Sequence, residues 1–161
     1  MTAQTALPHT KVLRDILLDT LSRDIHVAPS EPWAPTLREP GAVAVYVDDS
    51  WRARALISCS LTLSVALAAS RDLITSKVAT SCIEAGRLTD DLADSLNEVL
   101  DTLSAMFNRP DRPHLKLFAV HLPGSPPPAD ISAQLRAFGR RADLTVEVAG
   151  YRCGRLSLVL C

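Results

Sequence analysis

The stretch Thr89–Phe107, TDDLADSLNEVLDTLSAMF, predicts a long amphipathic helix. Its large apolar residues recur at helical spacing and fall within about one third of the turn. They are Leu92, Leu96, Val99, Leu100, Leu103, Met106 and Phe107. The opposite face carries Asp94, Glu98 and Asp101, with only the small Ala105 beside them. We therefore expect one face of this helix to pack on a core and the other to present a row of carboxylates.

The size and composition of the chain predict one globular domain. The chain has 161 residues, of which 47% are hydrophobic, and its formal net charge is −1. That charge argues against a nucleic-acid binder, which needs a clearly basic face. No apolar run reaches the ~18 residues that a membrane span needs, and MTAQTALPHTK lacks a secretory pattern. We expect a cytoplasmic protein with a single domain over residues 10–161, preceded by a flexible segment at 1–9.

The cysteines predict no metal site. They are Cys59, Cys82, Cys153 and Cys161, and no two of them form a C-x-x-C pair. No His-x-x-x-His accompanies them, so a zinc site is not expected. Cys59 and Cys153 lie in strand-like stretches, where a reduced cysteine behaves as a small hydrophobic residue. We therefore expect reduced, structural cysteines.

The first half of the chain predicts a helix, a hairpin and a second helix. Lys11–Leu21 has helical periodicity. His26–Glu39 is rich in proline, which fits an extended edge segment or a connection. Gly41–Val47 and Trp51–Cys59 predict a β-hairpin, and because the first run is apolar on both faces we expect it inside the sheet. Ser60–Ala69 alternates like a strand, but its first serine can cap a helix and no turn pair follows, so we predict a helix.

The second half predicts mainly strands. His114–Leu122 has the pattern of a strand. A short helix is predicted by three apolar residues, Ile131, Leu135 and Phe138. Its outward side would carry three arginines, Arg136, Arg140 and Arg141. Asp143–Ala149 and Tyr151–Leu160 predict a hairpin about Gly150. Because hairpins join most of the strands, we expect an α+β fold with a largely antiparallel sheet and helices packed on it.

The chain resembles the CheC/CheX/FliY group of chemotaxis phosphatases, and CheX-like proteins most closely. The resemblance covers nearly the whole chain from about Lys11. It is one of layout: an opening helix, a glycine-led hairpin, a following helix, a long helix that carries the site, and terminal strands. The group's motif on the long helix is Asp or Ser, three residues, Glu, two residues, Asn, with a small residue four further on. The matching positions here are Asp94, Glu98, Asp101 and Ala105.

The resemblance implies a protein that hydrolyses the aspartyl phosphate of a CheY-like receiver domain. In that group the motif helix docks on the phosphorylated receiver, the asparagine amide orients a water for in-line attack, and the glutamate meets the receiver's lysine. The Mg²⁺ belongs to the receiver, so the resemblance implies no cofactor of the chain's own. Carried over by position, Glu98 and Asp101 are the catalytic residues. Asp94, Glu98 and Ala105 are then the residues that contact the partner.

The chain departs from the motif where Asp101 replaces the asparagine. An ionised carboxylate only accepts hydrogen bonds, and it brings negative charge toward a dianionic phosphoryl group. Two like charges ~4 Å apart cost about 1 kcal/mol in water and about 4 kcal/mol at an effective dielectric constant of 20. The substitution can therefore remove much of the group's acceleration. Alternatively, Asp101 can act as a general base toward the water or pair with the partner's Mg²⁺.

The opening helix lacks a second copy of the motif, because Asp15 and Asp19 are not followed by the required partners. This favours a CheX-like protein with one site over a CheC-like protein with two. CheX-like members pair through their sheets, so the resemblance implies a homodimer. The expected sheet edges are the runs Trp51–Cys59 and Arg155–Leu160.

Three alternatives to an active phosphatase stay open. One is a receiver-binding adaptor of the same fold that is catalytically weak or inactive. Another is a structural protein of the flagellar-switch type that ignores phosphorylation. The third is that the carboxylates on the long helix only keep a solvated face soluble, which is the ordinary role of such rows.

Overall fold

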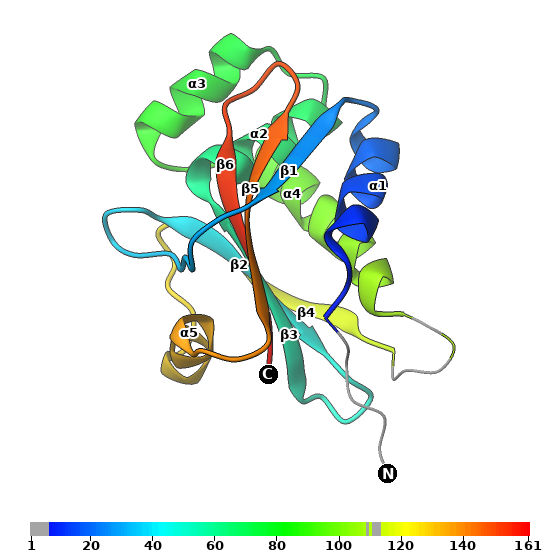
Figure 1. Cartoon of the computed structure of the whole chain (residues 1–161). Helices are drawn as coiled ribbons and strands as arrows, with labels where there is room; N and C mark the ends of the chain where they lie inside the picture. Colours follow the sequence, from blue (N-terminus) through cyan, green and yellow to red (C-terminus); the bar gives the residue numbers. More distant parts are fainter. Residues whose placement is uncertain (1–6, 109, 111–113) are drawn as a thin grey trace.

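The computed structural model describes residues 7–108, 110 and 114–161 (Figure 1). Its helices are α1 (Thr10–Leu21), α2 (Leu61–Arg71), α3 (Ser76–Ala85), α4 (Asp90–Leu103), the 3₁₀ helix η1 (Ser104–Phe107) and α5 (Ala129–Arg136). Its strands are β1 (Ile25–Pro29), β2 (Gly41–Val47), β3 (Ala53–Ser60), β4 (Lys116–His121), β5 (Arg141–Val148) and β6 (Gly154–Leu160). Within these residues the strands form a six-stranded sheet in the order β1-β5-β6-β3-β2-β4, with every neighbouring pair antiparallel. The predicted α+β fold is confirmed.

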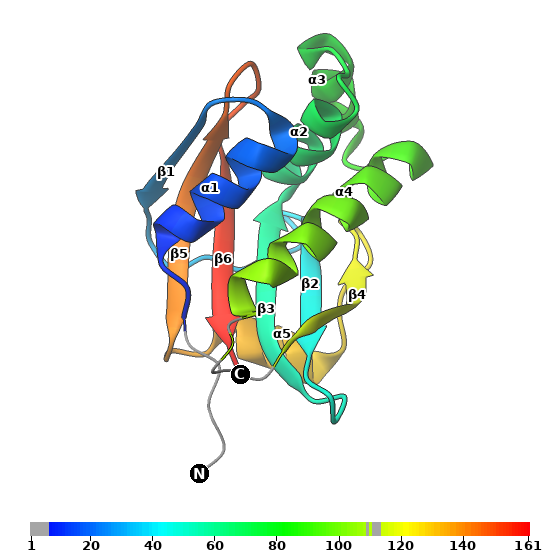
Figure 2. The same cartoon turned by 90° about the vertical axis from the view of Figure 1, so that its right-hand side faces the viewer.

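The two faces of the sheet are covered unequally. Figure 2 shows α1, α2 and α4 on the same face, and the larger core cluster joins these helices to the sheet. On the other face, α5 buries Ile131 and Leu135 against a second cluster. The other buried members of that cluster are Val43, Val45, Val47, Leu56 and Val159. Burial on both sides explains why β2 is apolar throughout.

The β2–β3 hairpin lies inside the sheet, as its apolar sequence predicts. Gly41 pairs with Ser60 at the open end of the hairpin, and β2 is flanked by β3 and β4. A Cβ atom on Gly41 would lie 2.3 Å from the carbonyl oxygen of Cys59. Such a distance requires the backbone to move, so only glycine fits at the start of β2.

Helix α4 is fixed by its cap, its apolar face and one buried hydroxyl. The Thr89 side chain accepts a hydrogen bond from the backbone N–H of Leu92, which caps the helix. The hydroxyl of Tyr46 on β2 donates to the carbonyl of Leu100 at 2.6 Å. Burial raises the pKa of Tyr46 well above its ordinary value of 10.0, with smaller contributions from Cys59 and Asp101. The neutral phenol therefore remains a donor that ties the helix to the sheet.

A largely buried polar network holds the proline-rich segment after β1 on the second face of the sheet. Asp143 accepts hydrogen bonds from the backbone N–H of Trp33 at 3.0 Å and from the Ser157 hydroxyl at 2.6 Å. Arg141 forms an ion pair with Asp143 at 2.8 Å and also donates to the Trp33 carbonyl. The expectation that Arg141 points outward from a helix is therefore wrong. Arg141 begins β5, and α5 ends at Arg136.

The predicted edges of the sheet are also wrong for two strands. Within the described residues, β3 and β6 pair with each other in the middle of the sheet, and the edges are β1 and β4. Of the two alternatives for the proline-rich run, both occur: its first residues lie in the edge strand β1 and the rest forms a connection to β2. The sequence did not predict helix α3. Cys153 is exposed in the connection between β5 and β6, so it is not a core residue of a strand.

Candidate functional site

The carboxylates of the predicted motif lie on the outer face of α4. Asp94, Glu98 and Asp101 are exposed, and Ala105 in η1 is exposed beside them. The opposite face of α4 is buried through Leu92, Ser95, Leu96, Val99, Leu100 and Leu103. Figure 2 shows α4 in the layer of helices on one face of the sheet, and the exposure of these four residues makes this side of α4 accessible to a partner protein. We call Asp94, Glu98, Asp101 and Ala105 the motif face.

Glu98 already has a cationic partner within the chain. The guanidinium Nη2 of Arg71, the last residue of α2, lies 2.9 Å from Oε2 of Glu98. The side chains are 42% and 61% exposed, respectively. An exposed pair of this kind contributes only about 0–1 kcal/mol to stability. It nevertheless places a positive charge beside the Glu98 carboxylate, which any further cation would have to share.

A second contact from α2 fixes the buried side of the same helix. The hydroxyl of Ser95 donates to the carboxylate of Asp72, with Oγ–Oδ distances of 2.7 and 2.6 Å. Asp72 is the C-terminal cap residue of α2, and Arg71 precedes it. These two side chains therefore hold α4 in register against the end of α2. Both contacts thus join the helix that carries the motif face to the end of α2.

Asn97 belongs to the same exposed face, and the motif comparison did not select it. It lies three residues after Asp94 and four before Asp101, on neighbouring turns of α4. Neither Asp94 nor Asn97 has a side-chain hydrogen bond or ion pair with another described residue. The signal that identifies them is the spacing Asp-x-x-Asn, which repeats the carboxylate-to-amide interval of the motif one turn earlier.

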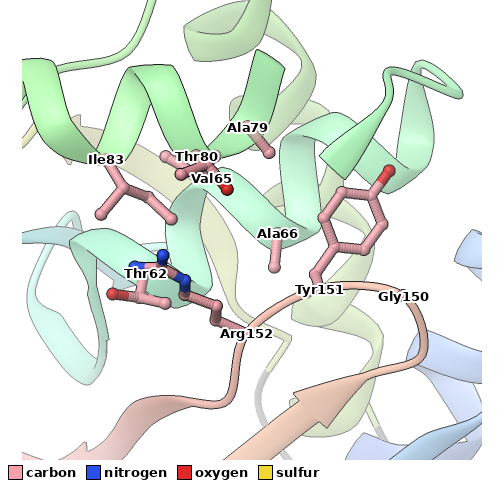
Figure 3. Close-up of a pocket in the computed structure, with 9 residues that line it drawn as sticks. All are labelled: Thr62, Val65, Ala66, Ala79, Thr80, Ile83, Gly150, Tyr151 and Arg152. Carbon is pink, nitrogen blue, oxygen red and sulfur yellow. The ribbon is translucent and has the colours of Figure 1, made fainter. Parts of the chain in front are cut away.

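Other features of the described residues offer fewer groups for binding or catalysis than the motif face does. A cavity of about 100 Å³ lies between α2, α3 and the β5–β6 connection, and none of its lining residues comes from α4. Figure 3 shows its mainly apolar walls, including Val65, Ala66 and Ile83, with Arg152 at the side. Burial raises the pKa of the Cys59 thiol to about 12, so it is not a nucleophilic thiolate at neutral pH. No three His, Cys, Asp or Glu side chains of the described residues form a group that could hold a metal ion.

Comparison with known proteins identifies the fold. No family model matches the chain, and no curated protein matches it. The crystal structure of the FliM middle domain from V. alginolyticus matches with a TM-score of 0.58 and 10% identity, over 92% of this chain and 86% of that chain. A chain of the FliM–SpeE complex from H. pylori matches with a TM-score of 0.60 and 8% identity, over 93% and 80%.

A third similar structure is a complex that contains CheY. A chain of the CheX–CheY–BeF3–Mg²⁺ complex from Borrelia burgdorferi matches with a TM-score of 0.51 and 8% identity, over 91% of this chain and 90% of that chain. At these identities the similarity shows the fold and no more. The chain thus has the fold shared by CheX and the FliM middle domain, and the predicted resemblance is confirmed at that level. Within the described residues, no helix is both long enough and apolar enough to span a membrane.

Proposed function

We propose that this chain, which has the fold of CheX and the FliM middle domain, acts on a phosphorylated receiver domain. It docks through the motif face of α4 and promotes hydrolysis of the aspartyl phosphate by positioning a water. The observation that carries this proposal is the exposure of Asp94, Glu98 and Asp101 on a helix whose other face is buried. Similarity to a chain of a CheX–CheY complex supports a receiver as the partner.

The proposed roles follow from what each side chain can bind. Glu98 meets a cation of the receiver, and Asp94 and Ala105 contact the surface around it. Asp101 faces the phosphoryl group and the water. The Mg²⁺ that neutralises the phosphoryl group belongs to the receiver in this proposal, so the chain supplies position and no cofactor. A cytoplasmic location remains a prediction of the sequence.

We expect Asp101→Asn to accelerate hydrolysis of the receiver's aspartyl phosphate. The substitution removes a negative charge near a dianionic group and supplies an amide that can both donate and accept. A like-charge cost of about 1 kcal/mol corresponds to roughly a fivefold change in rate, and stronger coupling gives more. Phosphate release from phosphorylated receiver domains of the same genome measures the effect, with Asp19→Asn on α1 as a charge-matched control.

The outcomes of that experiment separate the alternatives. An increase for Asp101→Asn but not for Asp19→Asn supports turnover on the motif face. Receiver binding without any acceleration, in the wild type and in Asp101→Asn, favours an adaptor. If neither the wild type nor Asp101→Asn binds a phosphorylated receiver, the proposed function is wrong.

A structural role in a flagellar switch is the second candidate. It is favoured by two FliM matches with TM-scores of 0.58 and 0.60, above the 0.51 of the CheX–CheY complex. It is also consistent with a carboxylate, Asp101, at the position where the motif has an amide. A protein of this kind binds flagellar components with the same affinity whether or not a receiver is phosphorylated. Pairing of two copies remains a further proposal, for which β1 and β4 offer the free sheet edges in the described residues.

A further inference from the structure

Where a protein surface promotes attack on a phosphoryl dianion, a neutral polar group beside the water avoids repulsion of the phosphoryl oxygens. Carboxylates repel the phosphoryl oxygens, whereas an amide can accept from the water and donate to a phosphoryl oxygen. The exposed face of α4 is mostly acidic, with Asp90, Asp91, Asp94, Glu98 and Asp101. The sequence of α4 contains one amide side chain, that of Asn97, and it is exposed.

The contacts on α4 favour the pair Asp94 and Asn97 over the pair Glu98 and Asp101. Glu98 is paired with Arg71 at 2.9 Å. A cation of the partner must therefore displace that guanidinium or share the Glu98 carboxylate with it. Asp94 has no such competitor among the described residues. Asp94 and Asn97 are three residues apart, and side chains at this interval project from adjacent positions on one helix face. The Asp94 carboxylate and the Asn97 amide thus lie next to each other, and neither is paired with another described residue.

We propose that Asn97 is the amide that holds the attacking water and that Asp94 is the carboxylate that meets the partner's cation. This assignment rests on the proposed function and shifts its reacting centre by one helical turn toward the start of α4. Arg71 then serves to occupy Glu98 and to reduce the negative charge beside the phosphoryl group.

The reaction at this position is a simple displacement. The water oxygen forms a bond to phosphorus, and the bond from phosphorus to the aspartyl oxygen breaks. The electron pair of that bond stays on the released aspartate carboxylate. Both protons of the water end on inorganic phosphate, so no further reactant is needed. The carboxamide of Asn97 remains unchanged and contributes only orientation.

The test compares Asn97→Ala and Asn97→Gln with the wild type in the receiver phosphate-release assay. Because one positioning hydrogen bond is lost, we expect kcat for Asn97→Ala to fall about tenfold to a hundredfold. We expect KM to stay within about twofold, because the charged contacts to the receiver are kept. Asn97→Gln keeps the amide and should recover part of kcat. Thr102→Ala on the same helix is the matched control and should leave kcat unchanged.

Circular dichroism and the midpoint of thermal unfolding establish that the variants are folded. If Asn97→Ala keeps wild-type kcat while Glu98→Gln loses it, the assignment to Asn97 is overturned and the motif face itself stands. If kcat falls equally for Asn97→Ala and Thr102→Ala, the effect is a general one on α4 and the assignment is likewise wrong. If the wild type does not accelerate phosphate release at all, the proposed function fails and this assignment fails with it.

Discussion

Asp143→Ala should lower the free energy of unfolding by about 3–5 kcal/mol, the usual loss when one member of a buried ion pair is removed. The side chains of Arg141 and Asp143 are 10% and 6% exposed. Removing the carboxylate leaves the guanidinium of Arg141 without its counter-charge. It also leaves the Trp33 backbone N–H without its acceptor, while the Ser157 hydroxyl keeps only the Trp33 carbonyl as an acceptor.

The same carboxylate makes stability depend on pH in the acid range. Burial alone would raise the pKa of Asp143, but hydrogen bonds from Arg141, Ser157 and Trp33 outweigh it and hold the pKa below the ordinary 3.8. The unfolded chain therefore binds the proton first, and the contribution of Asp143 is present above pH 3.8. It is lost as the pH falls through the lower pKa of the folded state. The difference in unfolding free energy between the wild type and Asp143→Asn should shrink over that interval.

Urea unfolding followed by circular dichroism measures these differences. Asp49→Ala in the exposed β2–β3 turn is a suitable control, since surface substitutions of this kind change stability by about 0.5 kcal/mol or less. A loss for Asp143→Ala no larger than that of Asp49→Ala would contradict the role of the network.

Leu96→Ala should also be strongly destabilising, by about 2–5 kcal/mol, because it opens a cavity under α4. Leu96 is 0% exposed within the core that joins α4 to the sheet. Asp94→Ala, two residues earlier on the exposed face, should change stability by only about 0.5 kcal/mol. The same unfolding measurement on the two variants tests the orientation of the helix. Similar losses of unfolding free energy for both variants would show that the acidic face of α4 is not exposed to solvent.

The sequence predicts the parts of this fold whose patterns are long and unambiguous. The α4 stretch has both a continuous apolar face and a threonine cap, and its α-helix ends at Leu103 with η1 completing the predicted range. The β2–β3 hairpin is similarly clear, because β2 is apolar and is buried at every position but its first glycine. In both cases local pattern and tertiary burial favour the same structure.

The errors arise where the local pattern is short or where distant residues decide. Helix α3 begins in the polar run Thr75–Ser81, and the side chains that it buries among the described residues, Ala79 and Cys82, are small, so the sequence did not predict it. Phe138 has an apolar side chain at helical spacing from Leu135, yet it is 93% exposed beyond the end of α5. The positions of β3 and β6 inside the sheet depend on which strands pair, and the hydrophobic pattern does not determine that.

The candidate site was predicted in part. The exposure of the motif carboxylates follows from the periodicity of α4. The ion pair between Arg71 and Glu98 does not, because it joins residues 27 positions apart on two helices. Asn97 was visible in the sequence as part of Asp-x-x-Asn. It gains importance only when the structure shows that Glu98 is occupied and Asp94 is not.

The most direct test of the central claim is the dissociation constant for a receiver domain of the same genome that is held active with BeF3⁻ and Mg²⁺. Calorimetry should be carried out on the wild type, on the double variant Asp94→Lys/Glu98→Lys, and on Asp15→Lys/Asp19→Lys of α1, which makes the same change in net charge. If the α4 face is the docking surface, the α4 variant should bind at least about tenfold more weakly, with the α1 variant close to the wild type. Equal affinity of the α4 variant and the wild type would contradict the account.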